Sequence, residues 1–542
     1  MIHDALANKN GKPIDIEVTD FRQCFDTLWL EEVMNDLYEA GIDDDNLALV
    51  YEANKSINVA VKTPNGLTAR EKIERIVLQG DVFGPLECSV LIDTFGKECM
   101  DQEKYLYMYK NEVGIPPLAM IDDLVTIAHC GTESVVMNSY LNAKSSIKKL
   151  QFGMGKCHKL HVGKERKSCP DLFLDEWKVK IVEETGYITL QDVQENDHIV
   201  EEVSDEKYLG DIISKDGRNI KNIKARAAKA NGSINQIMEI LENVCFGSFQ
   251  FEVAMIFRNS LFLSSFLFNS EAWYNVTSAD IDEMEKVDEM LLRRILECPE
   301  STPKEMLYLE LACMPIRFIL MSRRILFLQT ILQESDSSLI SRFYQVQLKN
   351  PSKGDWCQSV LKSLADLNLN LTFNQVKLMK KEELQKIVKT ACEKSALKYL
   401  NQVKSKHTKV MHIEHKSWDK QPYLQPKNLS IAEAKFIFLV RTRMLDLKCN
   451  FKNKYSDKNC PNCTQEDTQS HLLQCEKLVD ASGITIELPN YEDIFASNLQ
   501  QVLSVSRILN ENFTKRNKLK SQNVNHVNPD SVFYSNSVAV LE

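Results

Sequence analysis

Two short segments with strand periodicity end in acidic residues, and they constrain the fold more than any other part of the chain. In residues 13–21 apolar and polar side chains alternate, which is the period of a half-buried strand, and Asp20 stands at its end. In residues 114–130 two apolar runs flank Asp122 and Asp123, which predicts a hairpin with both carboxylates at its tip. For the Asp-Asp pair alone, a solvated turn is the better explanation.

Asp20 changes that weighting, because it adds a third carboxylate at the end of an apolar strand. Mg²⁺ prefers oxygen ligands, and two such ions about 4 Å apart stabilise the attacking and leaving oxygens of a phosphoryl displacement. Like charges held so close are costly without cations, so the grouping has a functional rationale. After the strand, residues 25–42 have helical spacing, with Asp26 or Thr27 as the expected cap and Gly41 as the expected end.

Length and composition indicate a large, mostly helical protein. The 542 residues predict roughly three or four domains. The hydrophobic and charged fractions, 44% and 26%, are ordinary for a globular chain, whereas 18 Gly and 15 Pro are few and favour long helices. Residues 208–430 are mostly helix-patterned, and the acidic segment 171–207 reads as strands and loops. An Asn/Ser-rich tail follows, with poor order expected from residue 510.

Charge and cysteine content exclude several classes of protein. The net charge of −10 excludes a uniformly basic nucleic-acid coat but leaves room for basic clefts. No apolar run approaches the ~18 residues of a membrane helix, and the N-terminus has no apolar core of signal-peptide type. Fifteen scattered cysteines then read as reduced thiols, which predicts an intracellular protein of nucleus or cytoplasm that is not secreted.

A Cys/His cluster near the C-terminus has the spacing of a structural zinc site. In CPNCTQEDTQSHLLQC the four ligands are Cys460, Cys463, His471 and Cys475. Two close thiolates followed by an imidazole and a thiolate one helical turn apart supply a tetrahedral donor set for Zn²⁺. Four protein ligands close the site, so the predicted role is structural; four unrelated cysteines and histidines are the weaker alternative.

Basic residues gather in two runs despite the acidic total. Residues 144–167 hold eight Lys or Arg and one acid, and residues 215–229 hold six and one. In the second run Lys221, Lys224 and Lys229 fall near one helical face. The functional interpretation is a track for the backbone of a primer–template duplex, and the alternative is a solvated helix face.

Five blocks in a characteristic order resemble the reverse transcriptase of non-LTR (LINE-type) retrotransposons. The resemblance covers most of residues 12–480 and implies an RNA-directed DNA polymerase. Its fold would be α+β: a partial right-hand polymerase palm with an antiparallel sheet, a largely helical thumb and connection region, and a small C-terminal zinc knuckle. The blocks are DFRQCFD at 20–26, LQGDVFGPL at 78–86, MIDD at 120–123, LQFGMGKCHKLHVGK at 150–164 and KYLGDIIS at 207–214.

The resemblance implies roles for individual residues. Asp20, Asp122 and Asp123 would be the catalytic carboxylates that hold Mg²⁺ or Mn²⁺. The nucleotide- and primer-binding residues would be Phe25 beside the sugar, Gln79 and Gly80 at the template and nucleotide pocket, Lys156 near the triphosphate, and Tyr208, Leu209 and Gly210 at the primer end. Taken alone, Phe25 is better explained by core packing, and Gln79 equally well by an ordinary loop amide.

The sequence also departs from the family pattern. Met120 and Ile121 stand where the family has an aromatic and a small residue, and Gly84 replaces the usual Ser. Only nineteen residues precede Asp20, so the resemblance implies a truncated element without the fingers subdomain or an endonuclease domain. The expected domains are palm 1–214, thumb 215–300, connection 301–450, CCHC knuckle 451–480 and a partly disordered tail 481–542.

Two functions from different classes follow. The first is a reverse transcriptase that adds dNTPs to a DNA primer on an RNA template, with other element-encoded proteins as partners and no membrane. The second is a non-catalytic nucleic-acid-binding protein derived from a retrotransposon, held together by the thumb helices and the knuckle. A helical scaffold that binds proteins is a third and weaker possibility. Catalysis would depend on the aspartates, whereas binding would depend on Lys and Arg and fall with salt.

Overall fold

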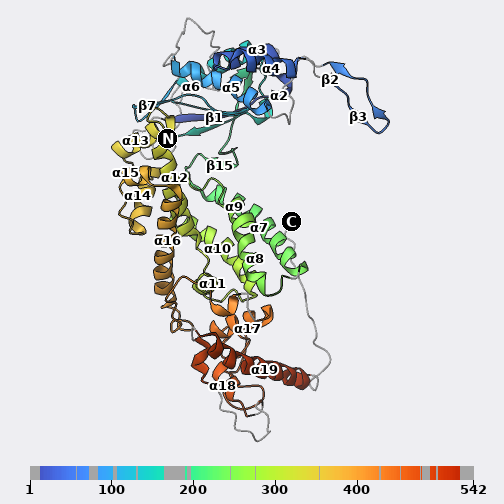
Figure 1. The fold of residues 1–542 in the computed structure, drawn as a ribbon, viewed down its shortest axis with the longest axis vertical. Helices are drawn as coiled ribbons and strands as arrows, with labels where there is room; N and C mark the ends of the chain where they lie inside the picture. Colours follow the sequence, from blue (N-terminus) through green and yellow to red (C-terminus); the bar gives the residue numbers. More distant parts are fainter. Residues whose placement is uncertain are drawn as a thin grey trace.

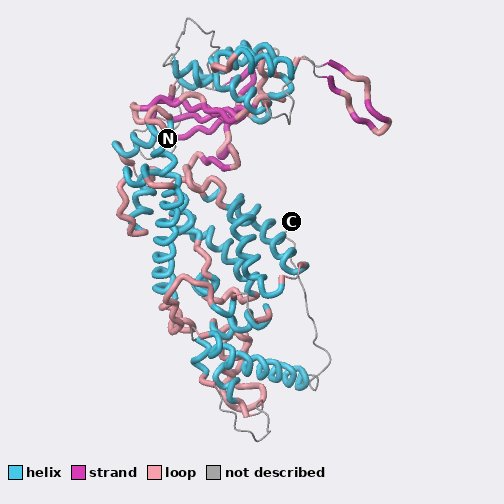
Figure 2. Tube along the Cα trace, in the orientation of Figure 1, coloured by secondary structure: helices cyan, strands magenta, loops and turns pink. Residues whose placement is uncertain are grey.

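The molecule is elongated, with a small sheet and its helices at one end and a long helical body below (Figures 1 and 2). The computed structural model describes residues 13–55, 58–72, 83–101, 106–129, 132–163, 189–191, 197–244, 246–274, 276–352, 354–425, 429–451, 453–476, 478, 489–495 and 498–524. The chain is therefore mixed α+β and mostly helical, as its composition and periodicity predict.

The strands lie almost entirely in the first 214 residues. They are β1 Ile14–Asp20, β2 Asn58–Val59, β3 Lys62–Thr63, β4 Gly66–Leu67, β5 Glu71–Lys72, β6 Tyr107–Tyr109, β7 Val113–Ile115, β8 Leu118–Met120, β9 Asp123–His129, β10 His158–Val162, β11 Thr189–Gln191, β12 Asp197–Ile199, β13 Glu201–Glu202, β14 Asp205–Tyr208 and β15 Asp211–Ser214. The main sheet has the order β13-β10-β1-β9-β8, and all its pairs are antiparallel except β10 with β13.

Helices cover the sheet and then form the body. They are α2 Cys24–Thr27, α3 Leu30–Glu39, α4 Asp44–Asn54, α5 Gly84–Asp101, α6 Thr132–Ile147, α7 Ile220–Asn243, α8 Gln250–Phe257, α9 Leu263–Phe266, α10 Ser278–Leu296, α11 Lys304–Leu311, α12 Ile316–Gln333, α13 Leu339–Lys349, α14 Trp356–Asp366, α15 Phe373–Leu378, α16 Lys381–Lys404, α17 Ile431–Arg441, α18 Gln469–Gln474 and α19 Leu499–Val524. Shorter helical turns are η1 Met154–Lys156, η2 Gly247–Phe249, η3 Arg258–Phe262, η4 Pro422–Leu424 and η5 Tyr491–Phe495.

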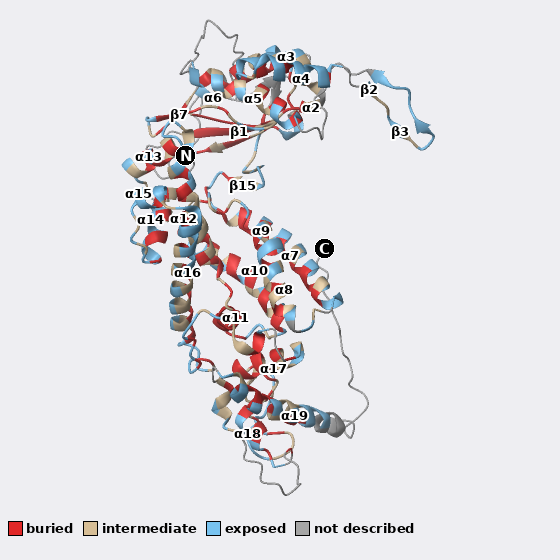
Figure 3. Cartoon of the chain, viewed as in Figure 1, coloured by how far each residue is buried: buried red, intermediate tan, exposed pale blue. Residues whose placement is uncertain are grey.

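Strand β1 is buried on both faces, which corrects the half-buried strand expected from its periodicity. The apolar face packs against β6, β7 and α13 through Ile14, Ile16 and Val18. The polar face is covered as well, because Glu17 is only 2% exposed and accepts a hydrogen bond from Asn138 of α6 at 2.7 Å. The alternation of apolar and polar residues in β1 therefore marks two buried faces of different chemistry, and Figure 3 shows this strand as buried.

The helix after β1 begins later than its sequence suggests. Helix α3 starts at Leu30 after Trp29, and no side chain caps it, so the cap expected at Asp26 or Thr27 is wrong. The short helix α2 occupies that position instead. The expected end is confirmed, because Gly41 follows the helix with a φ of 90°, where glycine is preferred.

The helical body has two hydrophobic clusters: α12 to α16 pack around one, and the larger one joins most of the other helices. It contains buried residues from α7 and α10 at one end to α17, α18 and α19 at the other, including Cys460 and Cys475. The thumb, connection and knuckle segments thus pack against one another, while the domain boundaries stay a prediction. Among the described residues, none of the helices combines the length and apolar character that a membrane span requires.

Helix α19 lies in the segment expected to be a partly disordered tail. It runs through residue 524, and Leu509, Asn512 and Arg516 are buried. The guanidinium of Arg516 donates to the buried carboxylate of Asp467 at 2.5 and 3.0 Å. Poor order was therefore the wrong expectation for residues 510–518, because Phe513, their one apolar side chain, and Arg516 both pack inward.

A buried ionic network ties α11 to the loop after α16, to η4 and to α17. Glu310 is fully buried and accepts hydrogen bonds from Arg441 at 3.1–3.4 Å, His415 at 2.9 Å and Tyr423 at 2.5 Å. Burial alone would raise the pKa of Glu310, but Arg441, His415 and Tyr423 together lower it to about 2. Arg441 also donates to the Ile494 carbonyl at 2.7 Å, which extends the network to η5.

Glu310→Gln should lower the free energy of unfolding by about 3–5 kcal/mol, because it leaves the buried Arg441 without a countercharge. Since the folded pKa lies below the ordinary value of 4.5, this contribution is present above pH 4.5 and is lost as the pH falls toward 2. The difference between variant and wild type in urea unfolding should therefore shrink over that range. The exposed Glu414→Gln is the control; an equally small effect of both substitutions at pH 7 would contradict the network's role.

Candidate functional site

Three carboxylates meet at one edge of the sheet. Asp20, the last residue of β1, is the register partner of Asp123, the first residue of β9. Met120 pairs with Asp123 across the β8–β9 hairpin, so Ile121 and Asp122 form its two-residue turn. The predicted hairpin is thus confirmed, with Asp122 in its turn and Asp123 in the pair that closes it, and the register of β1 places Asp20 opposite Asp123.

The turn that presents the aspartates has an unusual backbone. Ile121 has a φ of 61°, a value that β-branched residues adopt at a cost of order 1–3 kcal/mol. Ile121 packs partly against the hydrophobic cluster between the sheet and α3, α5 and α6. Packing of this side chain therefore holds the turn in its strained conformation and holds Asp122 at the sheet edge.

The carboxylates repel one another, and a lysine partly offsets this. Burial, followed by the charges of Asp122 and Asp20, raises the pKa of Asp123 above its ordinary value. The ammonium of Lys156 donates to both oxygens of Asp20, at 3.1 and 3.3 Å, and it remains 73% exposed. Negative charge therefore gathers at this edge of the sheet, and Lys156 offsets part of it.

Gly153 allows the loop that carries Lys156 to lie close to Asp20 at the end of β1. Its backbone N–H donates to the Asp20 carbonyl at 2.7 Å, and a Cβ at this position would come within 2.9 Å of Asp20 Oδ2. Next to it, the ring of Phe152 stacks on Phe21 at 5.1 Å. Sequence reasoning gave Gly153 no role; the glycine spacing in FGMGK was the available signal.

The hairpin expected at the primer end lies close to the carboxylates. Strands β14 and β15 pair around a turn of Leu209 and Gly210, with φ values of 47° and 84°. Burial and the charge of Asp123 raise the pKa of Tyr208, so this phenol is in the electrostatic range of the aspartates. Arg226 of α7 fastens the hairpin by donating to Asp211 at 2.6 Å and to the Gly210 carbonyl at 3.2 Å.

The remaining predicted residues are less informative. Phe25 is half-buried and packs against the cluster between the sheet and its helices, as core packing predicts. Gln79 and Gly80 lie outside the described residues.

The first basic run does not form an exposed track in its described part. Lys148 is buried against Asp36 at 2.5 Å, Lys144 pairs with Glu98, and Lys159 is 1% exposed within β10. Lys144 and Lys148 reach inward because acidic residues of α5 and α3 lie opposite them, whereas Lys149 and Lys156 remain exposed. Residues 164–167 lie outside the described residues.

The second run does form an exposed basic face on α7. Lys221, Lys224 and Lys229 are all exposed, and small exposed residues lie between the last two at 225 and 228 and just beyond them at 232. Lys221 pairs with Asp205 at 2.5 Å, which leaves Lys224 and Lys229 without ion pairs among the described residues. Small exposed residues between lysines let a phosphate backbone approach the helix closely.

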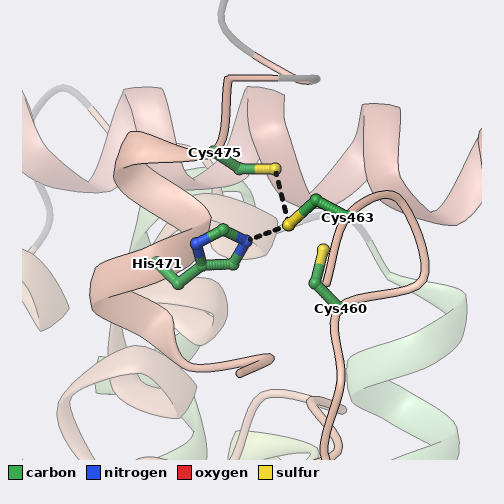
Figure 4. A group of neighbouring side chains, drawn as sticks. All are labelled: Cys460, Cys463, His471 and Cys475. Carbon is green, nitrogen blue, oxygen red and sulfur yellow. Dashed lines mark hydrogen bonds between the residues drawn. The ribbon is translucent and has the colours of Figure 1, made fainter. Parts of the chain in front are cut away.

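The Cys/His cluster assembles as predicted (Figure 4). Cys460 and Cys463 come from one loop, and His471 and Cys475 come from α18 and its C-terminal end. Their ligand atoms all lie within 4.8 Å of one another, close to the roughly 3.4–3.8 Å that tetrahedral Zn–S and Zn–N bonds impose. His471 Nε2 is 3.1 Å from Cys463 Sγ. The donor set fits zinc.

The surroundings of the cluster favour a structural role. Thr468 caps α18 by accepting from the His471 N–H at 3.1 Å, which orients the helix that carries two ligands. Burial raises the pKa of Cys460, while the backbone N–H groups of Asn462 and Cys463 that face its sulfur lower it. All four ligand positions are filled by the chain, so no open position remains for a substrate.

Comparisons with known proteins do not show a family for this chain. No protein-family model and no curated protein matches the chain. Among solved structures it is similar to telomerase from Candida tropicalis in complex with a TWJ fragment of telomeric RNA, at 11% identity and a TM-score of 0.31 over 74% of this chain and 51% of that one. It is also similar to the Candida albicans counterpart, at 13% identity and a TM-score of 0.26 over 55% and 48%. The chain spans about half the length of each, and at these TM-scores nothing about its activity follows.

Purified protein should hold one zinc ion per chain, and Cys475→Ser should lose it and lower the thermal midpoint of unfolding, because zinc binding supplies folding free energy. The measurement is metal content by mass spectrometry together with a thermal melt. Cys449→Ser is the matched control, since Cys449 lies nearby outside the cluster. Full zinc content in the Cys475 variant would contradict the assignment.

Proposed function

We propose that the chain is an RNA-directed DNA polymerase of the non-LTR retrotransposon type. In this reaction the 3′-hydroxyl of a primer attacks the α-phosphate of a dNTP, and pyrophosphate leaves. The observation that carries the proposal is the meeting of Asp20, Asp122 and Asp123 at one sheet edge, fixed by strand register and a two-residue turn.

The donor atoms present are of the kind that divalent cations prefer, since Mg²⁺ and Mn²⁺ take carboxylate oxygens as ligands. Burial first, and then the charges of Asp122 and Asp20, raise the pKa of Asp123, and such ions would neutralise these charges. Bound at Asp20, Asp122 and Asp123, the ions would supply charge stabilisation for the attacking and leaving oxygens. Lys156 is exposed and pairs with Asp20. When a divalent cation binds Asp20 instead, the ammonium of Lys156 can pair with a triphosphate oxygen.

The surroundings of the carboxylates supply positions for primer and template. The turn at Leu209 and Gly210 projects beside them, and Leu209 is 44% exposed. Below it, α7 presents Lys224 and Lys229 on a face with small residues, suited to a nucleic-acid backbone. The assignment to a retrotransposon, with an RNA template, DNA primer, dNTPs and other element-encoded proteins as partners, rests on the five sequence blocks.

A non-catalytic nucleic-acid-binding protein is the second candidate. One observation favours it: both oxygens of Asp20 already interact with Lys156, so an internal cation satisfies one of the three carboxylates. The basic face of α7 and the zinc cluster would serve binding without any chemistry. The two candidate functions differ in whether they require Asp20, Asp122 and Asp123.

Zinc-loaded protein should extend a DNA primer on an RNA template with Mg²⁺ or Mn²⁺, and Asp122→Asn with Asp123→Asn should lower the rate by a factor of about 10³ or more, because charge stabilisation at the reacting oxygens is lost. The measurement is primer extension resolved on a gel. Asp93→Asn, an exposed carboxylate of α5, is the matched control.

Extension by wild type and control alone would support the polymerase. Undiminished nucleic-acid binding by folded, zinc-loaded wild type that never extends a primer would contradict it and favour the second candidate.

Lys224→Gln with Lys229→Gln should weaken binding to an RNA–DNA duplex and reduce the magnitude of the slope of log K against log salt by about 2, because each lysine neutralises one phosphate. Fluorescence anisotropy over a salt series measures this slope. Lys362→Gln with Lys398→Gln, which alters exposed lysines of α14 and α16, should leave the slope unchanged. Equal slopes for both double variants would exclude the α7 face as the contact.

A further inference from the structure

The helical body contains a cavity of about 590 Å³ that the proposed polymerase reaction does not use. This partly open cavity is lined by α8 and η3 on one side, by the end of α11 and the start of α12, by α16, and by the loop that carries Trp418 and Lys420. This volume lies within the range of about 300–1,000 Å³ that is typical of small-molecule sites.

One wall of the cavity is the π-helical segment η3, and the charge of its arginine, Arg258, is already neutralised. Arg258 forms a bidentate pair with the buried Asp288, at 2.7 and 2.6 Å, and donates to the Met314 carbonyl at 2.9 Å. Arg323 is similarly engaged, with the Leu267 carbonyl and with Glu271 at 3.5 Å. Neither guanidinium is left to attract a ligand, but both make the wall rigid. Single π-helical turns occur frequently at functional sites.

One lysine supplies positive charge that the lining does not neutralise. Lys420 is about half-buried and forms no ion pair with any carboxylate of the described chain. Burial lowers its pKa, and the charge of Glu252 raises it by less. Lys389, by contrast, is exposed and pairs at 3.9 Å with Glu393, which also lines the cavity. A half-buried ammonium without a close counterion is stabilised by an anion that brings its own charge.

Much of the rest of the lining is apolar, with Asn259 and Ser322 as its uncharged polar residues. The apolar part is formed by Leu263, Leu311, Met314, Phe318, Ile319 and Trp418. An apolar body seated against these side chains would be removed from water, which favours binding by about 25 cal/mol per Å² of apolar surface buried. The cavity therefore combines a largely apolar lining with the ammonium of Lys420, which no carboxylate of the described chain pairs with.

We propose that this cavity binds a small amphipathic anion, an apolar body carrying one anionic head group that pairs with Lys420. The proposal is independent of polymerase activity, because none of the residues near the three carboxylates lines the cavity. An inorganic anion lacks the body, and a neutral apolar molecule lacks the head group, so both should bind more weakly.

The test is a fluorescence titration of full-length, zinc-loaded protein with 8-anilinonaphthalene-1-sulfonate, an aromatic sulfonate. Wild type should show one saturable site per chain. Lys420→Gln should weaken binding by about tenfold or more, because a charge-assisted hydrogen bond is lost. Ser322→Phe, which fills the cavity from α12, should abolish it. Lys362→Gln on α14 is the control and should bind as wild type does.

A competition on wild type keeps the test decisive even if a variant fails to fold. Octanoate should displace the probe, whereas octanol and inorganic phosphate at the same concentrations should displace it about tenfold less effectively. Equal displacement by octanol would overturn the claim that the ligand needs an anionic head group. Non-saturable probe binding, or wild-type affinity in folded Lys420→Gln and Ser322→Phe proteins, would overturn the site itself.

Discussion

Strand β1 determines the register on which the candidate catalytic site depends. It pairs along its whole length with β9 and along most of it with β10, so one residue of slippage would move every side chain to the opposite face. Both faces are buried, one apolar and one polar, and each resists such a slip. Because Asp20 ends this strand and Asp123 begins its neighbour, the register itself brings the two carboxylates together.

The helical body depends on buried charge more than its composition suggests. Glu310 with Arg441, Arg258 with Asp288, and Arg516 with Asp467 are ion pairs almost without exposure. Each joins elements distant in sequence, and removing one partner would leave a buried charge. The Arg516 pair also anchors α19 beside the loop of the zinc cluster, so metal binding and helix packing support the same end of the molecule.

Local features were predictable from the sequence, and long-range ones were not. The β8–β9 hairpin, the end of α3 at Gly41 and the four zinc ligands follow from spacing within about 20 residues. The partner of Lys148 is Asp36, 112 residues away, and no pattern in residues 144–167 reveals it. The same holds for the buried Glu17 and for Arg226, whose charge fastens a hairpin instead of facing solvent. The composition of this segment predicts a poorly ordered tail, because the polar residues of α19 outnumber the residues that pack against the core.

The central claim is that Asp20, Asp122 and Asp123 form a divalent-cation site. The most direct measurement is Mn²⁺ binding to the zinc-loaded protein, followed by electron paramagnetic resonance. The account predicts saturable binding that Asp20→Asn with Asp123→Asn abolishes while zinc content and thermal stability are retained. Absence of Mn²⁺ binding by the wild type, or the same affinity in the double variant, would contradict it.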